Sequence, residues 1–312
     1  MSYYPMQQTT FSIKDKNGTD RATGSFMYPY EVPALTTVNT PEMSGIELIF
    51  QRMDPSIDCF LFHINANVEP CWFGVAVPQA VRDFSHPHIF FHPQPHQAGL
   101  HDGRYANFIT DPDWAAVYRY VASLGMQLAA TPKKQFVIVP FLTQRICKPG
   151  VGIFNAEWLD IVKDIQDQLK RKYGLSAGGG IEELVVSSFS AGLEYSHLFR
   201  TGGKDVQHYL REVYDFDGLG SSSASRCSSV VTRRGVRGWR YDKVGNSLDL
   251  KFLTAEAGQG RFHLPWERWA RVTPQIKPRG PGPNLAKLAE EDVHARIIQR
   301  MFYHACALSK VG

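Results

Sequence analysis

The sequence contains no apolar run long enough to cross a bilayer. Its first ten residues, MSYYPMQQTT, include neither a basic cap nor an apolar segment. A membrane span and a secretory signal are therefore not expected. Cysteine is scarce, because the five residues are odd in number, scattered and free of any C-x-x-C pair, which favours reduced thiols. No internal repeat is present. Together these absences predict a soluble protein of the cytoplasm.

A large excess of charge of one sign is also missing. The formal net charge of +4 is small for 312 residues and does not by itself indicate a nucleic-acid partner. With 43% hydrophobic and 21% charged residues, the composition is that of a globular protein with a sizeable core, and we expect one domain over residues 1–312. We interpret one basic run as a solvated face. It comprises Arg226, Arg233, Arg234, Arg237, Arg240 and Lys243.

What the sequence does contain is a strand, a sharp turn and a helix in immediate succession. The apolar run over residues 181–186 follows three glycines and predicts a buried strand. Residues 188–192, SFSAG, interrupt this run, and residues 193–199 then have apolar side chains at helical spacing. Such a turn needs small residues beside its apex, which here is Ser190. The simplest interpretation of Ser190 is a helix N-cap.

Strands and amphipathic helices alternate along the chain. Strands are predicted at residues 46–51, 59–64, 71–78, 88–91, 135–141, 181–186, 209–216 and 250–255, and helices from about Asp113, Glu157, Leu193 and Val293. The first three strands suggest an antiparallel edge, after a polar lead-in over residues 1–45 with short strands at most. The alternation beyond them implies a mostly parallel sheet flanked by helices on both faces.

Two segments break this alternation. Residues 218–246 are rich in serine and arginine, and residues 265–283 are rich in proline. We interpret both as loop insertions, which commonly roof an active site.

The pentapeptide SFSAG resembles the G-x-S-x-G nucleophile elbow of the α/β-hydrolase superfamily, with Ser188 in place of the first glycine. The order of strands and helices over residues 45–310 carries the same resemblance. It implies an α/β-hydrolase fold and a serine hydrolase, most simply an esterase that acts on a small acyl substrate without a cofactor. The superfamily's chain order of serine, acid and histidine fits Ser190, a carboxylate and His294.

The acid and the histidine each have an alternative. Ligands bind beyond the carboxyl ends of strands in an open parallel sheet, and both Asp217 and Glu256 follow predicted strands. We take Asp217 as the acid and Glu256 as its alternative, whereas Asp249 begins a strand and is expected at the opposite end. His294 lies at the start of the last helix, and His263 is its competitor.

These residue types suit acyl transfer. A serine hydroxyl needs a neighbouring base, histidine titrates near neutral pH, and a carboxylate orients and supports the imidazolium. The resemblance assigns the oxyanion hole to the backbone N–H groups of Ala191 and Gln94, because Pro93 has no N–H to donate.

Two other functions stay open. A non-catalytic binding protein of the same fold is compatible with the departures at Ser188 and Pro93. A metal-dependent enzyme is compatible with a histidine cluster, although its spacing matches no known ligand motif. The cluster comprises His86, His88, His92, His96 and His101.

Overall fold

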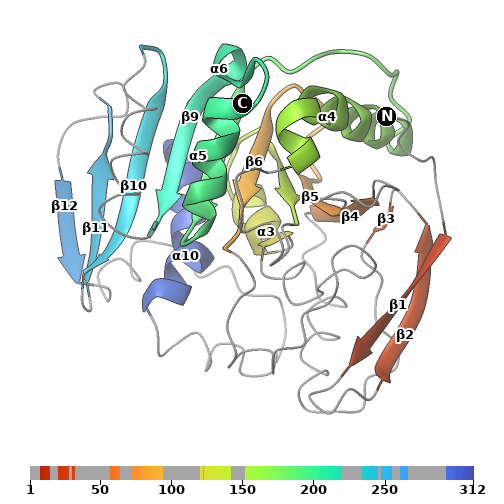
Figure 1. Ribbon diagram of the computed structural model, residues 1–312, viewed down its shortest axis with the longest axis horizontal. Helices are drawn as coiled ribbons and strands as arrows, with labels where there is room; N and C mark the ends of the chain where they lie inside the picture. The colour runs from red at the N-terminus through yellow and green to blue at the C-terminus, as the bar shows by residue number, and fades with distance from the viewer. Residues whose placement is uncertain are drawn as a thin grey trace.

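The computed structural model describes residues 8–14, 20–27, 30–31, 57–63, 72–93, 120–121, 123–141, 152–218, 234–244, 247–254, 261–265 and 293–312. Within these described residues, ten strands form one sheet in the order β12-β11-β10-β9-β8-β6-β7-β5-β4-β3 (Figure 1). Their bounds are β3 Tyr30–Glu31, β4 Ile57–His63, β5 Trp72–Pro78, β6 Pro87–Phe91, β7 Phe136–Pro140, β8 Leu184–Phe189, β9 Leu210–Phe216, β10 Arg237–Val244, β11 Ser247–Phe252 and β12 Arg261–Pro265. In the lead-in, β1 (Gln8–Lys14) and β2 (Asp20–Met27) form a separate antiparallel pair.

The centre of the sheet is parallel and its edges are antiparallel. Strands β7, β6, β8, β9 and β10 pair in parallel, while β3–β5 on one side and β11–β12 on the other pair antiparallel. Strands β6, β7 and β8 are buried at every residue, which suits central strands covered on both faces. The expected antiparallel edge is confirmed in β4 and β5, whereas the strand expected at 46–51 lies outside the described residues.

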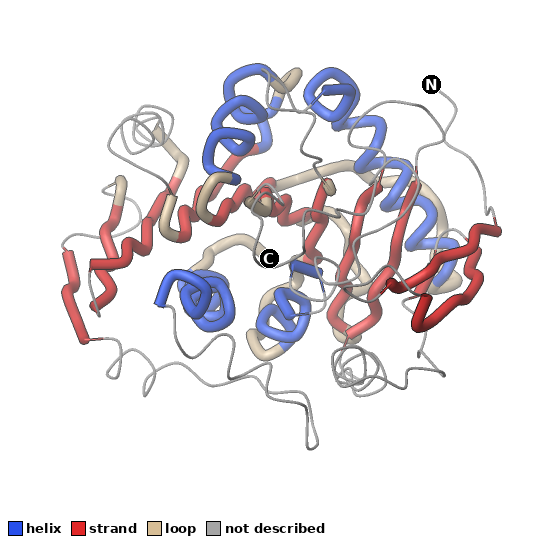
Figure 2. The backbone as a smooth tube through the Cα atoms, turned by 60° about the horizontal axis from the view of Figure 1, so that its bottom comes forward, coloured by secondary structure: helices blue, strands red, loops and turns tan. Residues whose placement is uncertain are grey.

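Helices cover both faces of the sheet (Figure 2). The helices α3 (Ser123–Ala129) and α10 (Val293–Leu308) pack on one face, and α4 (Gly152–Lys172) and α5 (Gly192–Gly202) pack on the other. A single turn of helix, α6 (Val206–Tyr209), leads into β9. In the part of the chain that is described, no helix has both the length and the apolar character that a membrane span requires.

The helix expected from about Glu157 begins earlier than its sequence suggests. It starts at Gly152, and Glu157 has non-helical angles (φ −122°, ψ 18°) at a bend inside it. Its expected end is confirmed, because Gly174 adopts φ +67° and Leu175 N–H donates to Lys170 O at 2.8 Å. The expected start at Asp113 lies outside the described residues.

The interpretation of residues 218–246 as an insertion is wrong over residues 237–244. These residues form β10, which pairs in parallel with β9. The expectation that Arg237 and Arg240 lie on a solvated face is also wrong. Arg240 is buried, and Arg237 Nη1 donates to the buried Glu212 at 2.7 Å. Because the arginines of β10 are paired with carboxylates of β9, the sequence of β10 does not show the apolar pattern by which a buried strand is recognised.

The direction assumed for the strand before Glu256 is also wrong. Strand β11 runs antiparallel to β10, so its carboxyl end at Phe252 pairs with Trp239 near the start of β10. The chain leaves β11 at the amino edge of the parallel strands. Asp249 instead pairs with Asp242 toward the carboxyl edge, contrary to its expected place. Glu256 itself lies outside the described residues.

A buried chain of hydrogen bonds crosses the core between the sheet and the α10 layer. His88 Nε2 lies 2.7 Å from Ser187 Oγ, and His88 Nδ1 lies 3.1 Å from Gln135 Oε1. Gln135 donates to Ser309 Oγ at 2.9 Å, and Ser309 donates to Glu212 at 2.6 Å. Because an amide oxygen only accepts, His88 Nδ1 carries the proton and Nε2 accepts from Ser187. Burial lowers the pKa of His88 to about 3, against the effect of its bond to Gln135.

This histidine should make the protein sensitive to acid. The unfolded chain binds a proton at His88 near pH 6.5, whereas the folded protein binds it only near pH 3. The free energy of unfolding therefore decreases as the pH falls through this window. The contribution at stake is on the order of 4 kcal/mol. Urea unfolding at pH values between about 4 and 7 measures this change. The free energy of unfolding should depend less steeply on pH in His88→Gln than in the wild type.

His208→Gln is the matched control, because His208 is exposed on α6. Its curve should keep the wild-type slope. Equal slopes for wild type and His88→Gln would contradict a neutral, buried His88.

Candidate functional site

The carboxyl ends of β6 and β8 lie at a switch point of the sheet topology. These strands are neighbours in the sheet, but the next described helix after β6 is α3 on one face, whereas β8 continues into α5 on the other. Where successive connections leave a parallel sheet to opposite faces, a ligand crevice opens beyond the strand ends. Ser190 lies at this position, directly after β8.

Ser190 is held in a strained turn between strand and helix. It adopts φ +52°, a left-handed value that is uncommon for any residue other than glycine. Ser190 N–H donates to Phe216 O at 2.9 Å, and Leu193 N–H donates to Ser190 O at 3.2 Å. The strand ends at Phe189, so the expected boundary at Val186 is wrong, because Ser187 and Ser188 are buried strand residues.

Gly192 makes this turn sterically possible. A Cβ on Gly192 would lie 2.8 Å from the carbonyl oxygen of His92 and closer still to that of Phe91. Only hydrogen fits between the start of α5 and the end of β6. The last glycine of the SFSAG pattern is therefore required by this packing contact.

The hydroxyl of Ser190 does not cap α5, so the interpretation of Ser190 as an N-cap is wrong. The N-cap position is Ala191, and the helix has no side-chain cap hydrogen bond. Among the described residues, neither the Ser190 hydroxyl nor the Ala191 N–H has a hydrogen-bond partner. Both groups stand at the positive end of the α5 dipole, which favours negative charge.

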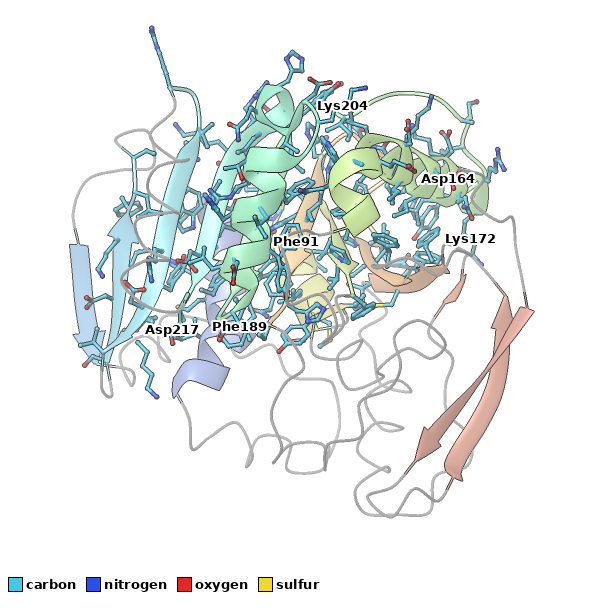
Figure 3. The ribbon with its side chains drawn as sticks, viewed as in Figure 1. Phe91, Asp164, Lys172, Phe189, Lys204 and Asp217 are labelled. Atoms are coloured by element: carbon cyan, nitrogen blue, oxygen red, sulfur yellow. The ribbon has the colours of Figure 1, made fainter. Side chains whose placement is uncertain are left out.

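Asp217 lies next to this turn, at the end of β9. Its predecessor Phe216 accepts the Ser190 N–H, and Figure 3 shows Phe189 and Asp217 together at the same edge of the sheet. Asp217 also has a left-handed φ of +52°, and its N–H donates to Tyr241 O at 2.6 Å. Its Oδ1 accepts the N–H of Lys243 at 2.9 Å, which fixes the carboxylate at the carboxyl end of β9.

The backbone of His294 lies beyond the carboxyl edge of the parallel strands. Near its end α10 reaches the amino edge of the sheet, where Leu308 O accepts from Arg237 Nη1 and Lys310 N–H donates to Glu212. His304 contacts Tyr241 on β10, and ten residues of helix span about 15 Å, so His294 begins the helix beyond the strand ends. The side chain of His294 lies outside the described part of the chain.

His263, the competitor, belongs to the outermost strand, β12. Four strand spacings separate β12 from β8, which amounts to roughly 19 Å. Gln94, the expected second oxyanion donor, lies outside the described residues, and the described chain after β6 ends at Pro93.

The described histidines of the cluster behind the alternative of a metal-dependent enzyme do not converge. His86 precedes β6 and lies 3.9 Å from Glu183, while His92 follows the strand at its other end. His88 is buried between Ser187 and Gln135. Within the described residues no group of three metal-ligating side chains is found, and His96 and His101 lie outside them.

A group of buried charged side chains lies beneath the turn and was not predicted from the sequence. Asp215 on β9 is completely buried, and Arg240 Nε lies 3.2 Å from its Oδ2. Burial raises the pKa of Asp215 to about 7, and the charges of Arg240 and Arg200 oppose this rise. Charged residues at alternate positions of two neighbouring strands, D-F-D and R-Y-D, were the available signal.

Comparison with known proteins gives no family. No protein-family model matches the chain, and no curated protein matches it. Among solved structures, the chain is similar to an arylesterase (13% identity, 64% of this chain, TM-score 0.30) and to a thermostable esterase from Pseudomonas putida ECU1011 (11%, 60%, 0.30). It is also similar to an acylaminoacyl peptidase from Pyrococcus horikoshii (11%, 69%, 0.28). The chain spans only 62%, 55% and 30% of these structures, and similarity this low does not establish a common activity.

The packing at Gly192 leads to a stability prediction. Gly192→Ala forces the start of α5 away from the carbonyls of Phe91 and His92, so the free energy of unfolding should fall by about 1–3 kcal/mol. Gly180→Ala is the control, because a Cβ there meets no atom within 4 Å. Urea unfolding of both variants measures the difference, and a Gly192→Ala protein as stable as Gly180→Ala would show that the contact is not a constraint.

Proposed function

We propose that this protein is a serine hydrolase of the α/β-hydrolase type that cleaves small carboxylic esters. The observation that carries the proposal is Ser190 itself. It is a serine in a left-handed conformation, at the sharp turn between a central parallel strand and a helix and at the switch point of the sheet topology. Strained residues of this kind cluster at functional sites.

The proposed reaction uses Ser190, His294 and Asp217. His294 removes the proton from Ser190 Oγ as the oxygen attacks the acyl carbon, and Asp217 orients and stabilises the imidazolium that forms. His294 then gives the proton to the departing alcohol. Water, activated by the same imidazole, releases the acid and restores the serine.

The negative oxygen of the tetrahedral intermediate needs backbone donors. We assign the N–H groups of Ala191 and Gln94 to this role. The Ala191 N–H supports the assignment, because it donates to no group among the described residues and lies at the start of α5. Donors fixed in this way act without reorganisation during the reaction.

The nucleophile is tested by covalent labelling. A fluorophosphonate probe should modify Ser190, as identified by mass spectrometry of the labelled peptide. Ser190→Ala should lower kcat for p-nitrophenyl acetate on the order of a millionfold.

Ser188→Ala is the matched control on the same strand, since the Ser188 hydroxyl is buried without a hydrogen-bond partner in the described structure. It should keep its activity and its labelling. A folded wild type that neither reacts with the probe nor hydrolyses esters would instead indicate a non-catalytic binding protein of the same fold.

The acid is tested by comparing two substitutions. Asp217→Asn keeps an oxygen for Lys243 N–H and suits a left-handed φ, so it should fold, yet it should lower kcat on the order of ten-thousandfold. Glu256→Gln should leave kcat near that of the wild type. In the wild type, kcat/KM should rise with pH through about 6.5 as the histidine becomes neutral. Loss of activity in Glu256→Gln alone would move the acid away from Asp217.

A further inference from the structure

A row of buried polar and charged side chains lies beneath the turn and crosses three strands. Ser188 of β8, Asp215 of β9 and Arg240 of β10 are register partners on the face that α5 covers. The opposite face of the same strands carries Phe189, Phe216 and Tyr241, which belong to the apolar core. Arg200 is completely buried in α5 above this row, and its charge acts on Asp215.

Stability does not account for this row. Removing charged groups from water costs several kcal/mol per ion, and well-packed apolar residues of similar volume are often as stable or more so. Together with Arg200, the row places one carboxylate and two arginines in the layer between α5 and the sheet, where apolar side chains would otherwise pack.

The row contacts the turn that carries Asp217. Arg240 Nη2 donates to Gly218 O at 2.9 Å. A Cβ on Gly218 would lie 2.6 Å and 2.9 Å from the two carboxylate oxygens of Asp215, and 2.5 Å from a methyl group of Leu193 in α5. The backbone at Gly218 is therefore in contact with the buried carboxylate and with the first turn of α5.

The same turn holds Ser190. Phe216 O accepts the Ser190 N–H at 2.9 Å, so residues 215–218 are linked to the turn after β8 as well as to β10. Ser190 and Asp217 both have left-handed φ values of +52°. A strained conformation of this kind persists only where the surrounding structure over-determines it.

We propose that Asp215 and Arg240 are positioning residues that hold Ser190 and Asp217 in the geometry required for ester hydrolysis. Arg240 holds the Gly218 carbonyl from one side and also donates through Nε to Asp242 on its own strand. The Asp215 carboxylate pairs with the buried Arg240 charge and fills the space under Gly218. Among the described residues, neither side chain forms a hydrogen bond with the Ser190 hydroxyl. The inference rests on the proposed hydrolase function and adds two residues that support the proposed nucleophile and acid from beneath.

The test separates positioning from stability by using two similar ion pairs. Asp215 and Arg240 pair across β9 and β10, and three residues earlier Glu212 and Arg237 pair across the same strands at the amino edge. In folded protein, Asp215→Asn should lower kcat for p-nitrophenyl acetate roughly 10- to 100-fold with little change in KM, because small misplacements of reacting groups cost about this much. Glu212→Gln should lower stability but keep kcat.

Arg240 provides a second test that does not depend on the folding of Asp215→Asn. Arg240→Met leaves Asp215 with a pKa raised by burial, so the carboxyl can become neutral by binding a proton. Arg240→Lys retains a charge and a donor. The expected order of kcat is wild type, then Arg240→Lys, then Arg240→Met, and the rate of fluorophosphonate labelling at Ser190 should follow the same order.

The outcomes distinguish this inference from the function on which it rests. If the wild type labels at Ser190 but the Asp215 and Arg240 variants keep the wild-type kcat, the positioning role is wrong and the hydrolase stands. Equal loss of kcat in Glu212→Gln and Asp215→Asn would also overturn the positioning role. If the wild type does not label at Ser190, both proposals fall together.

Discussion

The contact between the start of α5 and the end of β6 is the constraint on which the turn at Ser190 depends. Gly192 lies against the carbonyl groups of Phe91 and His92, where no side chain fits. This contact allows the chain to turn sharply after β8, which forces Ser190 into its left-handed conformation and leaves its hydroxyl and the neighbouring amide without internal partners among the described residues. A looser approach would let the chain enter α5 through ordinary angles, and Ser190 would then become a simple cap.

Pair geometry alone does not identify an active site in this protein. Ser187 Oγ and His88 Nε2 lie 2.7 Å apart, which is the distance expected of a serine and its catalytic base. Both residues are completely buried, and an amide of Gln135 occupies the place of the acid. This pair joins the sheet to the α10 layer. Ser190, three residues later, is 9% exposed whereas Ser187 is fully buried, and it differs from Ser187 in its left-handed conformation and its place at the strand end, which are the grounds for preferring it as the candidate.

The sequence contained most of the fold but only part of the site. Runs of mainly apolar residues predict β6, β7 and β8, because central strands are buried on both faces. Strand β10 could not be found in this way, since the arginines that suggested an exposed insertion are paired with carboxylates on β9. The direction of β11 could not be read either, because strand propensity does not distinguish parallel from antiparallel pairing. The assignment of Glu256 as an alternative acid depended on that direction, whereas Ser190 was located by a local pattern that needs no knowledge of distant partners.

The placement of β6 between β7 and β8 has a consequence for how the chain reaches its final state. The partners His88 and Ser187 are 99 residues apart in sequence, and Gln135 and Ser309 are 174 apart. During synthesis, the second edge of β6 stays unpaired until β7, α4 and then β8 have been made. The hydrogen bonds around Glu212 form only after residues 309–311 have been made. Contacts between residues this far apart in sequence form slowly, and chains that expose unpaired apolar strands in the meantime are prone to aggregate. The placement of β6 therefore leaves one edge of an apolar strand unpaired during synthesis until β8 is complete.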